Sequence, residues 1–96
     1  MQNEVLEFIN FRWKDSNAHW LDGNCYWFAH ILCTRFPYLE IIYLPVRGHF
    51  VAGSIKDRVY YDWTGIVQVD EVPMSLDWIK QNDNLWYQRI VRDCIN

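Results

Sequence analysis

The chain has 96 residues, of which 51% are hydrophobic and 18% aromatic, and its formal net charge is −3. This length corresponds to a single domain, residues 1–96, and the aromatic side chains supply apolar area for a compact core. The charges are scattered without a run of Lys or Arg, which argues against a nucleic-acid partner, and no apolar stretch approaches the ~20 residues of a membrane span.

The first half of the chain predicts two helices separated by a loop. Residues 2–13 carry apolar side chains at helical spacing and predict an amphipathic helix, whereas residues 14–24 are rich in turn formers. A second helix is expected from Cys25 to about Phe36, capped by Asn24 or Asp22 and ended by Pro37. Because that helix is apolar almost all round, we expect it to be central and buried.

The period changes after Pro37. Residues 39–44, 48–55 and 58–63 predict three β-strands, and residues 65–69 a short fourth. Ser75 is placed to cap a helix over residues 76–82, and residues 85–94 predict a last helix. The fold class is therefore α+β, with a central helix that carries Cys25 at its N-terminus on a small antiparallel sheet, flanked by N- and C-terminal helices.

The chain contains three cysteines, an odd number. Residues 1–14 carry four charged side chains and do not look like a signal peptide. We therefore expect free thiols and a cytoplasmic location, which is the host cytoplasm for a phage-encoded protein. In such a compartment a cysteine is core filler, a metal ligand or a nucleophile.

Position makes Cys25 the candidate nucleophile. The first turn of a helix has unpaired N–H groups and a partial positive charge, which favour a thiolate. The Cys25 N–H is also a candidate donor to the oxyanion of a substrate. The alternative interpretation is that Cys25 is an unreactive residue of the core, since cysteine is among the most buried residue types.

His49 and Asp62 are expected on the two strands that follow. If Lys56 and Asp57 form a two-residue hairpin loop, residue 51 pairs with 62 and 49 with 64, which puts His49 diagonal to Asp62 on one face. A four-residue loop keeps this parity and a three-residue loop breaks it. Asp62 can then hold one ring nitrogen of His49 and leave the other for Cys25. Taken singly, each of the three residues is more often structural than functional.

The segments around these three residues resemble a known superfamily. Asn24 to Ala29, Gly48 to Val51 and Tyr60 to Gly65 look like the papain-like cysteine hydrolases, in particular the compact, circularly rearranged branch that holds the NlpC/P60 and transglutaminase-like enzymes. The resemblance covers residues 22–65. It implies a Cys25–His49–Asp62 triad and thioester chemistry at an amide, peptide, isopeptide or related acyl bond.

The resemblance also points to residues that bind the substrate or oxyanion. Papain-like enzymes often place a Gln several residues before the Cys, where this chain has His19, so His19, Asn17 or the backbone alone is expected to stabilise the oxyanion. The wider set of substrate candidates adds Asn24, Trp20, Gly48 and Trp63. NlpC/P60 enzymes are usually secreted wall hydrolases. A cytoplasmic or phage-encoded enzyme that acts on a protein, peptide or small amide or acyl compound fits this chain better, without a metal or other cofactor.

Two alternatives remain at the level of sequence. The first is a zinc site of Cys25, His30 and Cys33, joined by His19 or Cys94, although residues 25 and 33 lie two helical turns apart and no C-x-x-C motif exists. The second is a non-catalytic binding or inhibitor protein on the same frame, with an aromatic partner surface. That surface would draw on Trp13, Trp20, Trp63, Trp78 and Trp86.

Overall fold

The computed structural model describes residues 2–12 and 25–95. Its first two elements are helices α1 (Gln2–Arg12) and α2 (Cys25–Arg35), which confirms both helices expected in the first half of the chain. α2 stops just before Phe36 and Pro37, as expected from the absence of an N–H on proline. None of the described helices is long and apolar enough to cross a membrane.

The sheet is antiparallel, with the strand order β4-β3-β2-β1-β5. The three longer strands agree with the predicted segments to within about one residue at each end: β1 (Glu40–Leu44), β2 (His49–Ser54) and β3 (Val59–Asp62). The predicted fourth strand is shorter than expected, because β4 contains only Gly65–Ile66. A fifth strand, β5 (Met74–Ser75), was not predicted, and it pairs with β1 immediately before the next helix.

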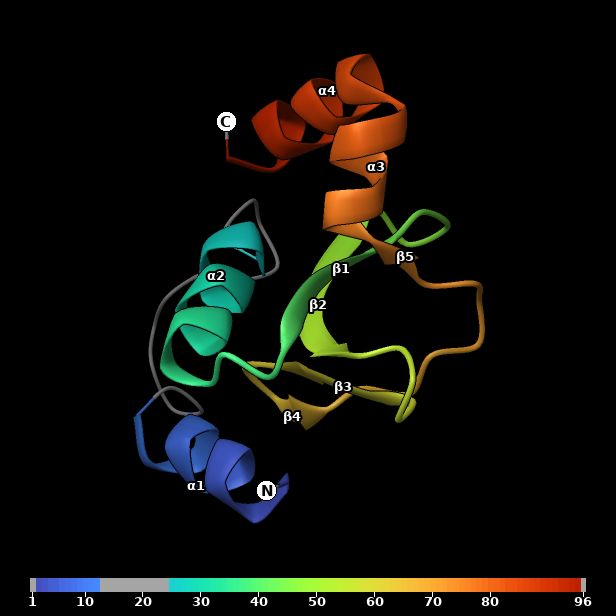
Figure 1. Ribbon diagram of the computed structural model, residues 1–96. Helices are drawn as coiled ribbons and strands as arrows, with labels where there is room; N and C mark the ends of the chain where they lie inside the picture. Colours follow the sequence, from blue (N-terminus) through green and yellow to red (C-terminus); the bar gives the residue numbers. More distant parts are fainter. Residues whose placement is uncertain (1, 13–24, 96) are drawn as a thin grey trace.

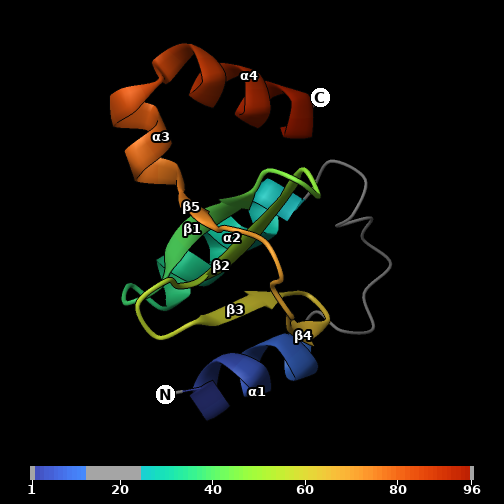
Figure 2. The same ribbon diagram turned by 90° about the vertical axis from the view of Figure 1, so that its right-hand side faces the viewer.

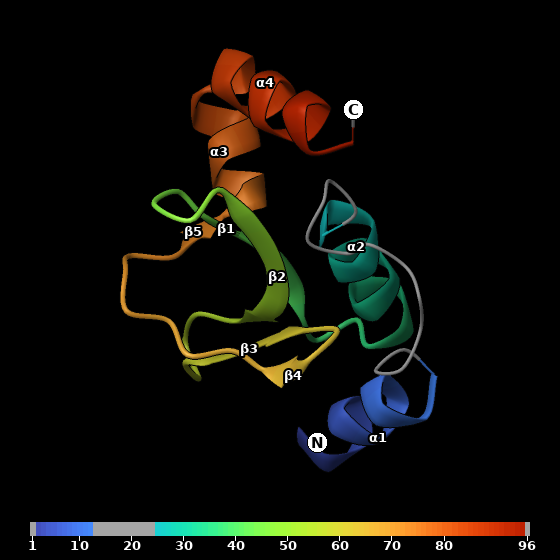
Figure 3. The same cartoon turned by 180° about the vertical axis from the view of Figure 1, so that it is seen from behind.

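The C-terminal region is helical, as the sequence predicted. α3 (Leu76–Asn82) has Ser75 as its N-cap, whose side chain accepts a hydrogen bond from the Trp78 N–H, and α4 (Asn84–Ile95) follows after a short break. α2 packs along one face of the sheet, α1 lies against β4, and α3 lies against β1 and β5 at the opposite edge (Figures 1 and 3). The structure is therefore α+β with a small antiparallel sheet and flanking helices.

α2 is central, but it is not buried all round. Phe28, Ala29 and Leu32 are buried against the sheet, whereas Trp27 is 46% exposed and His30 is exposed. The prediction of a helix buried on every side was therefore wrong. The sheet and the other helices cover only part of its circumference.

Two apolar clusters lie on the two faces of the sheet. The larger one joins α1, α2, α3 and α4 to the side chains of β2 and β3 that face them, including Phe50, Ala52 and Tyr61. The smaller one contains Ile42, Leu44, Val51 and Tyr60 on the other face, covered by Val67 and Val69. Those two valines belong to the segment between β4 and β5, which runs along the side of the sheet away from α2 (Figure 1).

The register of the β2–β3 hairpin agrees with the one expected from the sequence. Ala52 pairs with Tyr61, Gly53 with Tyr60 and Ser54 with Val59, around a turn over residues 55–58. This pairing has the parity that places His49 and Asp62 on the same face. The alternation of side chains along β2 and β3 thus brings His49 and Asp62 within reach of one another.

Candidate active site

Cys25 is the first residue of α2 and is only 5% exposed. Neither Cys25 nor Cys33 forms a disulfide bond in the described part of the chain. The first turn of α2 contains no acidic residue, so the partial positive charge of the helix N-terminus is not offset by a carboxylate from its own first turn. This electrostatic setting favours a negatively charged sulfur.

His49 and Asp62 form a buried pair. His49 Nε2 lies 3.3 Å from Asp62 Oδ2, and the two residues are 9% and 8% exposed. His49 is the first residue of β2 and Asp62 the last of β3, so the pair sits where the two strands end. Figure 2 shows this end of the sheet beside the first turn of α2.

The ring of His49 also forms a hydrogen bond with Cys25. Strand alternation directs His49 to the face opposite α2, but Cys25 and His49 are each the first residue of their element. The thiol and the ring therefore meet at the end of the sheet rather than through it. The structure thus brings together the three residues that the sequence singled out, with His49 in contact with both of the others.

These contacts set the charge of the imidazole. Burial by itself lowers the pKa of His49, but hydrogen bonds with Asp62 and Cys25, together with the attraction of their negative charges, outweigh burial and raise the pKa of His49 to about 9. Burial acts to raise the pKa of Asp62, yet hydrogen bonds from His49 and Thr64 hold that pKa below its ordinary value. At neutral pH the pair is therefore an imidazolium beside a carboxylate.

Thr64 is a residue of this site that the sequence analysis did not assign to it. Its backbone N–H donates to Asp62 Oδ1 at 2.8 Å, and its hydroxyl donates to the same oxygen. This is an Asx turn, which the Asp-Trp-Thr spacing signals, because an Asp side chain commonly accepts from the backbone two residues on. The turn occupies Oδ1 and leaves Oδ2 for His49.

The remaining candidate residues are divided between the described and undescribed parts of the chain. Trp63 is half-buried and its ring meets that of His49 edge-on, with 6.5 Å between ring centroids. Gly48 precedes His49 with a φ of 65° and is exposed. Four of the predicted oxyanion or substrate residues lie outside the described residues: Asn17, His19, Trp20 and Asn24.

The other described cysteine has a different environment. Burial, followed by the negative charges of Glu40 and Asp77, raises the pKa of Cys33 to about 12. Cys33 is therefore a neutral thiol under ordinary conditions. Over residues 2–12 and 25–95, the structure contains no group of three or more His, Cys, Asp or Glu side chains that could hold a metal ion. Of the predicted zinc ligands, His19 and the Cys94 side chain lie outside the described part.

Nearly the whole chain, residues 6–95, matches the family model described as Phage YunG-like protein. The chain belongs to the Phage YunG-like protein family. No curated protein and no solved structure gives a significant match to it. The family name carries no chemistry, so the function of this Phage YunG-like chain has to be argued from its own side chains.

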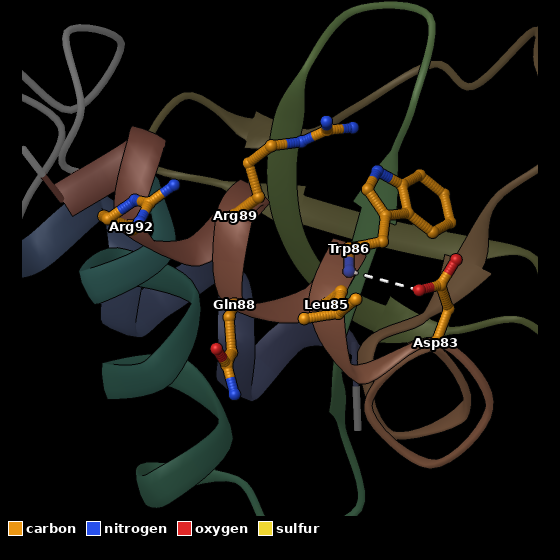
Figure 4. Close-up of a pocket in the computed structure, with 6 residues that line it drawn as sticks. All are labelled: Asp83, Leu85, Trp86, Gln88, Arg89 and Arg92. Carbon is orange, nitrogen blue, oxygen red and sulfur yellow. Dashed lines mark hydrogen bonds between the residues drawn. The ribbon is translucent and has the colours of Figure 1, made fainter.

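A second surface of the molecule is hollowed at α4 and carries none of the three residues above. The N–H of Trp86 donates to Asp83 Oδ1 at 3.2 Å at the start of this helix, and in Figure 4 the Gln88 amide points away from the guanidinium groups of Arg89 and Arg92. Leu85 is 80% exposed there. The described residues that line the pocket are Asp83, Leu85, Trp86, Gln88, Arg89 and Arg92.

Proposed function

We propose that the protein is a small cysteine hydrolase or acyltransferase of papain-like design that acts on an amide, peptide or isopeptide-type bond through a thioester. The observation that carries this proposal is the ring of His49, which contacts Cys25 and Asp62 and whose pKa is raised to about 9. A positively charged imidazole beside a helix-start cysteine favours the thiolate, which is the nucleophilic form.

The proposed reaction has two halves, formation of a thioester on Cys25 and its breakdown, and His49 transfers one proton in each half. The Cys25 thiolate attacks the acyl carbon, the C–N bond breaks, and the His49 imidazolium gives its proton to the leaving amine. Water or another nucleophile then gives a proton to His49 and attacks the thioester, which releases the acyl product and the thiolate. His49 Nε2 faces Asp62, so Nδ1 is the ring nitrogen left for these transfers.

The other parts of the site have supporting roles in this proposal. Asp62 keeps the imidazole oriented and stabilises its positive charge, as the third member of such triads does. The Cys25 backbone N–H, at the unpaired start of α2, is the first oxyanion donor. His19 or Asn17 supplies the second. The substrate is a protein, a peptide or a small amide or acyl compound, and membership of a phage family agrees with action in the host cytoplasm.

The test is iodoacetamide labelling as a function of pH, with the labelled cysteine assigned by mass spectrometry. Wild type is expected to be labelled at Cys25 at about pH 6 to 7, well below the ordinary thiol pKa of ~8.5. Cys33, whose pKa is about 12, is the internal control and stays unlabelled. In His49→Ala the labelling of Cys25 at this pH is expected to fade, because the imidazolium is gone.

Two results would contradict the proposal. One is labelling of Cys25 that begins only as the pH approaches ~8.5, and the other is labelling that is unchanged in His49→Ala. Once a substrate is known, Cys25→Ala is expected to abolish turnover. Asp62→Ala is expected to retain some activity, because the nucleophile and the base remain.

A non-catalytic binding function is the second candidate, and the α4 pocket favours it. Exposed Leu85, Arg89 and Arg92 line the same pocket as half-buried Trp86 (Figure 4), and Trp and Arg are enriched where binding energy concentrates. Trp78 on the neighbouring α3 is 53% exposed. If both described cysteines prove unreactive at neutral pH, this surface becomes the basis of the function.

A further inference from the structure

The carboxylate of Glu71 binds the turn that joins β1 to β2. The Val46 N–H donates to Glu71 Oε1 at 2.7 Å, and the Arg47 N–H donates to Oε2 at 3.2 Å. Arg47 Nε lies 3.8 Å from the same Oε2, and its Nη2 donates to the backbone carbonyl of Gln68. The Glu71 side chain is only 8% exposed, although the turn residues that it binds are exposed, and hydrogen bonds to a charged carboxylate are stronger than neutral ones.

This turn leads directly into His49. Gly48 closes it, with its N–H donating to the Leu44 carbonyl at 2.8 Å and a φ of 65° that favours glycine. His49 comes next and pairs with Leu44 across the β1–β2 ladder. The conformation of the turn therefore sets where β2 begins and the position of the His49 backbone from which the ring projects.

The His49 end of β2 depends on that turn more than the other end does. Ala52 and Gly53 pair with both β1 and β3, whereas residues 49–51 pair only with β1 in the described sheet. The ladder with β3 thus stops short of His49. The distance between His49 and Asp62 is not set by a direct backbone pairing of the two strands at that level.

The segment after β4 provides a second connection between the two strands. The Val67 N–H donates to the Tyr60 carbonyl at 2.8 Å, which attaches the segment to β3 two residues before Asp62. Val67 and Val69 pack on the small apolar cluster beneath the sheet. Residues 67–71 are therefore attached at one end to the strand that carries Asp62 and at the other to the turn that precedes His49.

We infer that Glu71, together with Arg47, is a positioning residue that holds the β1–β2 turn where the His49–Asp62 hydrogen bond can form. Glu71 acts through the turn and touches neither member of the pair. The inference deepens the proposed function and rests on it for any effect on activity, but the geometry of the pair can be measured without a substrate.

The test is the titration of the His49 ring, followed by NMR of the imidazole, in wild type, Glu71→Gln and Asp70→Asn. The two variants each remove one negative charge from neighbouring positions. Asp70 contacts Arg47 at 3.2 Å, with a side chain that is 90% exposed, and serves as the control because no backbone N–H of the turn binds it in the described structure. Among the described residues, Cys25 and Asp62 are those whose interactions raise the pKa of His49, and Glu71 is not one of them. A shift in the pKa of His49 that occurs only in Glu71→Gln therefore reports a change in the geometry of the His49–Asp62 pair.

Glu71→Gln is expected to lower the measured pKa of His49 by roughly one unit, as the bond with Asp62 lengthens, while Asp70→Asn leaves it unchanged. The labelling rate of Cys25 at neutral pH is expected to fall in parallel. A folded Glu71→Gln variant in which His49 titrates as in wild type would overturn the inference, as would equal shifts in the two variants. If Glu71→Gln does not fold, Arg47→Gln takes its place under the same criterion. Absence of Cys25 labelling in wild type and in every variant would refute the proposed function. The NMR titration would still test whether Glu71 positions His49.

Discussion

Replacing Asp62 by Asn isolates the electrostatic contribution of the buried pair. The substitution keeps an oxygen that can accept the Thr64 N–H, which now binds Asp62 Oδ1 at 2.8 Å, so the Asx turn is preserved. It replaces the carboxylate oxygen that lies 3.3 Å from His49 Nε2 by a group without charge. We expect the pKa of His49 to fall well below its value of about 9, because burial then acts against the charged ring with only Cys25 to offset it.

The size of the effect on stability follows from that pKa. A folded-state pKa raised from 6.5 to about 9 corresponds to roughly 3 kcal/mol of stabilisation, at about 1.4 kcal/mol per unit. Since the pKa is raised on folding, this stabilisation is fully present below pH 6.5 and is lost as the pH rises through about 9. The pKa of Asp62 is lowered, so its own contribution is lost only when acid protonates it. The pair therefore stabilises the fold most in mildly acidic solution.

The assay is urea unfolding of wild type and Asp62→Asn at about pH 6 and about pH 10, with the His49 titration followed by NMR. The destabilisation by Asp62→Asn is expected to be large at the lower pH and to shrink by up to roughly 3 kcal/mol at the higher one. Titration of cysteines in the unfolded chains is common to both proteins and cancels in the difference. A destabilisation that is the same at both pH values would refute the assignment of a charged His49–Asp62 pair.

Two further substitutions test the fold around the site. Gly53→Ala is expected to destabilise the protein by about 3 kcal/mol or more, because its Cβ would lie 2.2 Å from the Val59 carbonyl oxygen, a backbone atom that cannot move aside. Gly48→Ala, where the nearest atom is 3.9 Å away and only the positive φ opposes a side chain, is expected to cost about 1 kcal/mol, and equal melting temperatures for the two variants would contradict this reasoning. Ser75→Ala removes the N-cap of α3, whose hydrogen bond from the Trp78 N–H is 3.4 Å long, and is expected to destabilise by about 0.5 to 1 kcal/mol. Ser75→Asp should restore the melting temperature, and a Ser75→Ala variant as stable as wild type would show that the cap contributes nothing.

The sequence by itself determined the local elements and one long-range relation. Pro37 ended α2, Ser75 capped α3, and runs of β-branched and aromatic residues bounded by turn formers predicted β1, β2 and β3, because each of these signals acts over a few neighbouring residues. The one long-range relation came from the hairpin loop between β2 and β3, because a loop with an even number of residues places His49 and Asp62 on one face. The short strand β5 escaped prediction, since two residues are too few to form such a run.

The tertiary structure alone decided the contacts between segments that are distant in the chain. The approach of Cys25 to His49 depends on how α2 packs on the sheet, and the Glu71 carboxylate reaches the Val46 N–H across 25 positions of sequence. The exposure of Trp27 likewise follows from which side of α2 the sheet leaves uncovered. Propensity and period describe a residue and its near neighbours, whereas these contacts arise from the packing of whole elements against one another, which no local pattern encodes.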